Sequence, residues 1–178
     1  MLNISGKIII GDYVNIELES IRLTRYQETK HKDLKEDFDT GGSHSNFIHQ
    51  IPSRLETSKN NNRSIYQSAF VVEVDDIPLG YLFISSRVRD EVFLEYAVLK
   101  KYRGLGYGSL IVSEVSDYLF QNQNIKAIRL DIDPSNKNSI LTAEACGYNL
   151  DEEEFASRNY TGRMQFIKDS TYYVSKRR

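Results

Sequence analysis

The residues best suited to chemistry lie in one short stretch, Tyr96 to Leu110, which reads YAVLKKYRGLGYGSL. Its apolar start predicts the end of a strand, and a helix is expected to follow from about Ser109. Three glycines stand between them, Gly104, Gly106 and Gly108. Glycine permits positive φ and close approach of the backbone to a ligand, and a helix N-terminus offers unsatisfied N–H groups. The stretch therefore predicts an anion site suited to a pyrophosphate, with Arg103 and Lys101 adding charge.

The three glycines are open to three other interpretations. A phosphate-binding P-loop requires Gly-Lys-Ser/Thr, but Gly108 is followed directly by Ser109. A dinucleotide-binding loop requires Gly-x-Gly-x-x-Gly, and the spacing differs here, although Asp131 stands where its acidic residue could lie. A tight strand-to-helix turn that binds nothing stays open on these residues alone.

The loop resembles that of the GNAT superfamily of acyl-CoA-dependent N-acyltransferases. Residues 103–108, RGLGYG, fit the family's Arg/Gln-x-x-Gly-x-Gly/Ala pyrophosphate loop, and Val98 fits the apolar valine before it. About thirty residues on, 136–148 resemble the family's Asn-x-x-Ala/Ser helix that ends in Gly-Phe/Tyr. Arg22-Leu23-Thr24-Arg25 faintly resembles the opening strand. The resemblance covers roughly residues 20–150 in the family's order.

This resemblance implies a GNAT fold of the α/β (α+β) class, a mixed, largely antiparallel twisted sheet of six to seven strands flanked by helices. It also implies acetyl-CoA as the acyl-donor cosubstrate, with no metal. Backbone N–H groups of the loop would hold the pyrophosphate, and the backbone after the strand would pair with the pantetheine arm. The cofactor-binding residues implied are Val98, Leu99, Arg103, Gly104, Leu105, Gly106, Tyr107, Gly108 and Asn136.

The general acid of the transfer is harder to assign. Many family members protonate the departing thiolate from a tyrosine four residues before the closing glycine, and Ala143 stands there in this chain. Ser139 lies one turn earlier on the same helix face and is the hypothesis for the acid. The alternative is that Ser139 is a plain polar residue of the helix's first turn.

For the general base, strand parity favours Glu95, which faces opposite Val98 on the strand just before the loop. A structural ion pair between Glu95 and Arg129 is the alternative. The three histidines show no metal-ligand spacing, and Cys146 is expected to be a small buried helix residue rather than a nucleophile. No metal site is predicted.

Periodicity places the other elements. It predicts strands within 8–25 with a turn at Gly11-Asp12, a helix over 26–38 and a long loop over 39–64 that is either a lid or a mobile insertion. A hairpin over 69–85 turns at Asp75-Asp76. A strand over 91–99 and one over 127–132, joined by a helix, should be parallel neighbours. A last helix over about 136–146 should stop at Gly147.

The bulk composition limits the remaining choices. At 178 residues the chain is expected to be a single acetyltransferase domain over 1–178 with its core at about 20–150. The net charge of −2 makes nucleic acid a poor partner, and no apolar run is long enough for a membrane span. Cys146 is the only cysteine, which excludes an intramolecular disulfide and suits the cytoplasm.

The sequence therefore predicts an N-acetyltransferase acting on an amine, either a small molecule or a peptide or protein N-terminus. Transfer of a longer acyl chain is the enzymatic alternative. A non-catalytic module that binds acyl-CoA as a sensor or partner domain is the alternative of another class. Homodimerisation stays open, and the acceptor has no code in the sequence.

Overall fold

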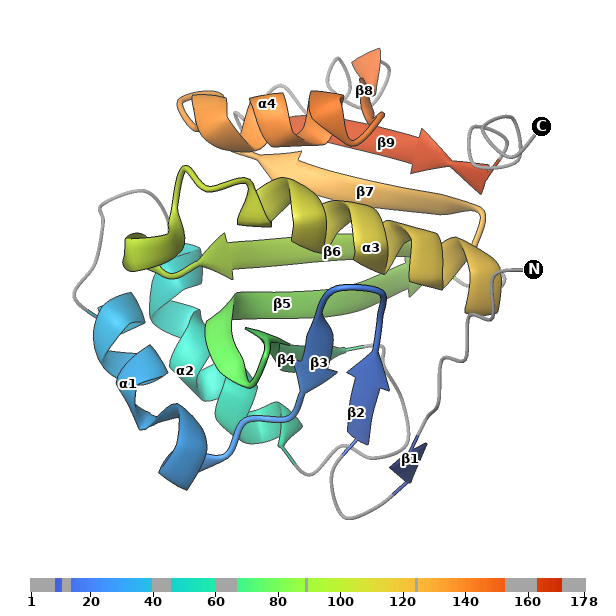
Figure 1. Ribbon diagram of the computed structural model, residues 1–178. Helices are drawn as coiled ribbons and strands as arrows, with labels where there is room; N and C mark the ends of the chain where they lie inside the picture. Colours follow the sequence, from blue (N-terminus) through green and yellow to red (C-terminus); the bar gives the residue numbers. More distant parts are fainter. Residues whose placement is uncertain are drawn as a thin grey trace. The chain divides into compact units, whose positions relative to one another are not determined.

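The strand signals correspond to nine strands in the part of the chain that the structure, a computed structural model, describes. The described residues are 9–10, 14–39, 46–59, 67–88, 90–123, 125–152 and 163–170. They fall into two compact units, each assembled from two chain segments. Unit 1 contains 1–84 and 96–107, and unit 2 contains 85–95 and 108–178. Strands β5 and β6, labelled in Figure 1, each have residues in both units.

The strands of unit 1 follow one another in sequence order, each antiparallel to the next. They are β1 (Ile9–Ile10), β2 (Val14–Glu17), β3 (Arg22–Thr24), β4 (Ser68–Val74) and β5 (Ile77–Val88), the last reaching unit 2 after Ile84. The predicted β4–β5 hairpin is confirmed. Asp75 and Asp76 both have positive φ, 48° and 64°, as a two-residue turn that matches the twist of the strands requires. The predicted turn at Gly11-Asp12 lies outside the described residues.

Two helices belong to unit 1, α1 (Glu28–Asp39) and α2 (Asn46–Ser58). The first confirms the predicted helix, but α2 lies where a loop over 39–64 was expected, so that expectation is wrong for 46–58. Ile51, Leu55 and Ser58 are buried at helical spacing. This short apolar stripe was not recognised because Pro52 lies inside the helix and because polar residues flank the helix on both sides.

A hydrophobic cluster joins the two helices to the sheet of unit 1. Leu34 of α1 and Leu55 of α2 pack in it with Tyr81 of β5 and with Leu99, which follows β6. The cluster is completed by Tyr26, Ile51, Ala69 and Val71. It therefore anchors the beginning of the glycine loop to the same core that holds both helices.

Unit 2 contains a short mixed sheet in the order β6-β7-β9-β8. Its elements are β6 (Glu91–Val98, in this unit as far as Glu95), α3 (Tyr107–Asn122), β7 (Ala127–Ile132), α4 (Lys137–Ala145), β8 (Asn149–Leu150) and β9 (Met164–Asp169). β6 and β7 pair in parallel from Glu91↔Ala127 to Leu94↔Leu130, as predicted. β9 is antiparallel to both β7 and β8.

The fold is thus mixed α/β with a mostly antiparallel sheet and flanking helices, which confirms the predicted class. The strand number exceeds the expected six to seven. β1 fits the strand expected before Gly11-Asp12, whereas β8, of two residues, leaves no periodic signal in the sequence. None of the described helices is both long and apolar enough to cross a membrane.

Candidate functional site

The glycine loop connects the end of β6 to the start of α3. Leu99 is followed by a 3₁₀ turn, η1 (Lys100–Tyr102), and α3 begins at Tyr107. Gly104 and Gly106 have φ of +78° and +85°, a conformation that side-chain-bearing residues rarely adopt. A Cβ added to either glycine would meet nothing within 4 Å. The loop backbone therefore borders open space beside a helix N-terminus, which fits the pyrophosphate of a CoA thioester.

The predicted cofactor-binding residues of unit 1 lie together along this segment. Residues 103–106 are exposed, and Tyr107 stacks edge-on against Tyr102, with ring centroids 6.0 Å apart. The Lys101 ammonium lies 4.8 Å from the centre of the Tyr102 ring. Gly108 lies inside the first turn of α3, in unit 2.

Hydrogen bonds fix the backbone just before the loop. The Leu99 N–H donates to the Leu79 carbonyl at 2.9 Å, and the Leu99 carbonyl accepts from the Tyr102 N–H at 2.9 Å. The Arg103 Nε–H donates to the Val98 carbonyl at 2.9 Å. The N–H of Leu99 is therefore committed to β5.

Gly80 explains how β5 comes so near the end of β6. A Cβ added at Gly80 would lie 2.1 Å from the Ala97 carbonyl oxygen, far inside van der Waals contact. Only glycine allows this approach, and a glycine inside a strand pattern is the sequence signal for it. This position was not identified from the sequence.

Glu95, the candidate base, lies half-buried in unit 2, one residue beyond the last β6–β7 pair. The alternative ion pair with Arg129 is wrong. Arg129 instead pairs with Glu91 at 2.9 Å and with Asp151 at 2.6 Å. The structural role foreseen for a carboxylate near Arg129 thus falls to Glu91, which leaves the catalytic hypothesis for Glu95 standing as a prediction.

Asn136 and Ser139 meet at the start of α4. The Asn136 side chain is the N-cap of the helix, its Oδ1 accepting from the Ser139 N–H at 3.2 Å. The hydroxyl of Ser139 takes no part in that cap, and the residue is half-buried. Asn136 therefore has a structural role in addition to the cofactor contact predicted for it.

The end of α4 confirms the predicted stop at Gly147. This glycine has φ of +80°, its N–H donates to the Glu144 carbonyl at 2.9 Å, and the Tyr148 N–H donates to the Ala143 carbonyl at 3.0 Å. These two bonds form a Schellman motif. Cys146 is buried beside it, as expected.

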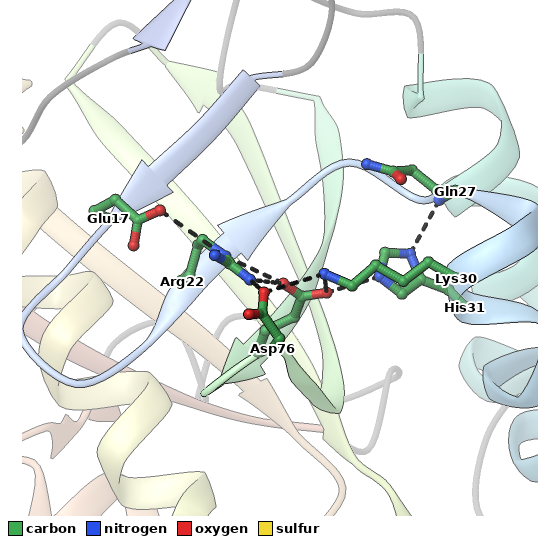
Figure 2. Close-up of polar contacts among 7 residues, drawn as sticks. Glu17, Arg22, Gln27, Lys30, His31 and Asp76 are labelled. Atoms are coloured by element: carbon green, nitrogen blue, oxygen red, sulfur yellow. Dashed lines mark hydrogen bonds and ion pairs between the residues drawn. The ribbon is translucent and has the colours of Figure 1, made fainter.

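Unit 1 contains a buried charge cluster that no sequence pattern predicted, drawn in Figure 2. Its centre is Glu73 on β4, whose side chain has no exposed surface. The carboxylate oxygens lie 2.7 Å from Arg22 Nη2, 2.8 Å from Lys30 Nζ and 2.8 Å from His31 Nε2. Arg22 and Lys30 also pair with Asp76 of the hairpin turn.

Hydrogen bonding determines the tautomer of the histidine and lowers the pKa of the carboxylate in this cluster. His31 Nδ1 accepts from the Gln27 N–H at 3.0 Å, so Nε2 carries the proton donated to Glu73. Burial raises the pKa of Glu73, but hydrogen bonds from His31, Lys30 and Arg22 outweigh it and lower the pKa to about 2. The partners lie 42 to 51 positions from Glu73 along the chain, too far for any local pattern to reveal. Within the described ranges, no group of three or more histidine, cysteine or acidic side chains could hold a metal ion.

Comparison with known proteins identifies the family. Residues 28–148 match the model of the acetyltransferase (GNAT) family, which is more than half of the chain. The chain belongs to that family. It is therefore an acyl-CoA-dependent N-acyltransferase. No curated protein matches this sequence.

Solved GNAT structures share the fold. A putative ribosomal-protein-serine acetyltransferase from Vibrio cholerae superposes with a TM-score of 0.68 at 16% identity, over 87% of this chain and 97% of that chain. A chimera built on the Vibrio cholerae spermidine N-acetyltransferase SpeG gives 0.65 at 14%, over 88% and 99%. RimL, a ribosomal alpha-N-protein acetyltransferase in complex with coenzyme A, gives 0.66 at 11%, over 86% and 98%. At these identities the likeness concerns the fold.

Proposed function

We propose that this GNAT protein transfers the acetyl group of acetyl-CoA directly to an amine, on a small molecule or on a peptide or protein N-terminus. The observation that carries the proposal is the loop after β6, where Gly104 and Gly106 take positive φ beside open space. Backbone N–H groups in such a loop, next to a helix N-terminus, suit a pyrophosphate. The single cysteine, Cys146, agrees with a cytoplasmic enzyme.

The chain's own residues would hold the donor at three places. Backbone N–H groups of Arg103 to Gly108 would bind its pyrophosphate, and Val98 would pair with the pantetheine arm as an added strand does. The Asn136 amide, whose Oδ1 caps α4, would use its NH₂ group as a donor. Leu99 is less suited than Val98 to pair with the arm, since its N–H is bonded to Leu79. When bound, acetyl-CoA supplies a thioester whose carbonyl carbon an amine can attack.

Two side chains would accept and donate the protons that the transfer requires. Glu95 would take a proton from the amine, directly or through one water, because an ammonium group has no lone pair with which to attack. Ser139 would supply the proton that the departing thiolate needs, in place of the tyrosine that Ala143 replaces. The new C–N bond replaces the broken C–S bond. Glu95 would pass the amine proton to water, and Ser139 would regain from water the proton that it gives to the thiolate.

The acceptor panel follows from the structural neighbours. The names of the solved neighbours specify ribosomal proteins in two cases and spermidine in another. We therefore propose peptides with free N-termini and polyamines as the first acceptors to test. Release of the CoA thiol from acetyl-CoA is expected to rise above the no-acceptor rate with at least one class.

The alternative function is a non-catalytic acyl-CoA-binding module. The substitution of alanine at 143 for the family's acid tyrosine is the observation that favours it. CoA binding without thiol release across the whole panel would support this module. The absence of both binding and release would contradict both functions.

A further inference from the structure

The Arg103 side chain lies back on the strand that precedes its loop. Its Nε–H donates to the Val98 carbonyl oxygen at 2.9 Å, and the residue is exposed to solvent. The acceptor belongs to β6, which is fixed by the Leu99–Leu79 hydrogen bond and by the contact of Gly80 with Ala97. The donor is a long side chain on the exposed loop. Of the two partners, only Arg103 can leave this contact at low cost.

This contact covers a group that the proposed function needs. If the Val98 backbone pairs with the pantetheine arm, its carbonyl is the acceptor for an amide N–H of that arm. The Arg103 guanidinium occupies this acceptor in the structure. A donor molecule must therefore displace the Arg103 guanidinium from this oxygen, or share the two lone pairs of the oxygen with it.

Phosphates change the balance of that competition. A guanidinium binds phosphate oxygens through bidentate hydrogen bonds in which donor and acceptor are both charged, whereas its bond to the Val98 carbonyl is single and has a neutral acceptor. Arg103 is adjacent to the loop that would hold the pyrophosphate. A donor that carries phosphates would draw Arg103 from Val98, whereas a donor without them would have to displace it unaided.

We propose that Arg103 is a specificity-determining residue that selects nucleotide-bearing acyl-CoA donors over acyl-pantetheine fragments lacking the phosphates. This inference rests on the proposed function, because it assigns the Val98 backbone to the pantetheine arm. It differs from a simple phosphate-binding role in one respect. Loss of the Arg103 side chain should improve the binding of a phosphate-free donor.

The experiment measures the affinity of the wild-type protein and of Arg103→Ala for CoA by calorimetry, and for pantetheine by ligand-observed NMR. For CoA, affinity is expected to fall at least fivefold in Arg103→Ala, because a charge-assisted contact is lost. For pantetheine, affinity is expected to rise about threefold to tenfold, because one net hydrogen bond no longer competes. The opposite signs are the diagnostic result.

Lys101→Ala is the matched control. It removes the same charge two residues earlier, and its ammonium lies over the Tyr102 ring rather than on Val98. This variant is expected to weaken CoA modestly and to leave pantetheine affinity as in the wild type. An equal gain of pantetheine affinity in both variants would overturn the inference, since charge alone would then explain it.

Other outcomes separate the inference from the proposed function. Wild-type protein that does not bind CoA would contradict the proposed function. Normal CoA binding, with pantetheine bound equally well or more weakly by Arg103→Ala, would overturn only the inference. If pantetheine binds neither protein at the highest usable concentration, the NMR resonance of the Arg103 Nε–H group tests the inference. It should shift or exchange faster on addition of CoA, and an unchanged resonance in saturated protein would overturn the inference.

Discussion

Gly106 illustrates how one backbone angle determines a binding site. Its φ of +85° is accessible to glycine. Because it has no side chain, open space remains where contact between the loop backbone and the ligand is proposed. Gly106→Asp would impose strain of about 1–2 kcal/mol and would place a negative charge in that space. We expect CoA affinity, measured by calorimetry, to fall at least tenfold, about 1.4 kcal/mol.

A Cβ added at position 106 meets no atom of the described residues within 4 Å, so the fold should survive. Circular dichroism should be unchanged. Ile77→Asp, which places the same charge at another exposed position of unit 1, controls for charge and should bind CoA normally. Unchanged CoA affinity in Gly106→Asp would remove the loop from the binding site.

The two catalytic hypotheses can be tested separately from cofactor binding. Glu95→Gln and Ser139→Ala are expected to lower kcat, with CoA affinity nearly unchanged, because general acid–base assistance is typically worth about 10²–10⁴-fold. The serine effect should be the smaller, since water can also protonate a thiolate. Ser139→Ala retains the backbone N–H that Asn136 caps, so α4 should remain intact.

Steady-state kinetics with the best acceptor of the panel, together with calorimetry for CoA, provides the measurement. If both variants keep full turnover, positioning alone drives the reaction and the catalytic assignment is wrong. A parallel loss of CoA affinity would instead indicate that these residues shape the cofactor site.

At the scale of elements, Glu73 ties α1 to strands β3 and β4. Three donors from those elements converge on one carboxylate that has no exposed surface. Glu73→Gln would leave Arg22 and Lys30 without its charge, although both reach solvent in part. We expect a loss of about 2–4 kcal/mol in the free energy of unfolding, measured with urea. Asp90→Asn, which breaks the surface pair with Lys126, should cost much less.

The same carboxylate makes stability depend on pH in a defined direction. The pKa of Glu73 is about 2 in the folded protein, below its ordinary 4.5, so ionised Glu73 stabilises the fold above pH 4.5. This contribution should disappear as pH falls from about 4.5 to 2. The stability difference between wild type and Glu73→Gln should therefore be constant near neutral pH and shrink in that window. A difference that persists at pH 2 would mean that packing, not charge, is responsible.

The sequence predicted those turns, loops and helix ends that depend only on residues close to one another along the chain. Gly104, Gly106 and Gly147 marked a loop and a helix stop because each needs positive φ, and the Asp75-Asp76 turn followed from two strand patterns. Long-range packing had no such signal. The helix around Pro52 is held by burial of Ile51 and Leu55, and the Glu73 cluster unites residues from separate elements. Neither could be derived without coordinates.

For the whole molecule, CoA should act as a stabiliser. A ligand that binds only the folded state adds about 2.7 kcal/mol at a free concentration of 100 times its Kd. In a chain of this size, that corresponds to a rise in Tm of about 5–10 °C. Thermal unfolding with and without CoA is the measurement. If Gly106→Asp binds CoA tenfold more weakly, the stabilisation at the same CoA concentration falls to about 1.4 kcal/mol, so the shift should be at most about half as large. Equal shifts in both proteins would place the binding site elsewhere.

The two interleaved units have a consequence for the order of events on the ribosome. All of unit 1 has been synthesised once Tyr107 is added, whereas unit 2 must wait for β9, which ends at Asp169 about 60 residues later. At about 5–20 residues per second, this delay lasts about 3–12 s. For about the first third of this delay, until Leu130 is added, residues Glu91–Leu94 have no β7 to pair with. In the nascent chain, β6 is thus an edge strand without its β7 partner, accessible to chaperones, at a time when unit 1 can already fold.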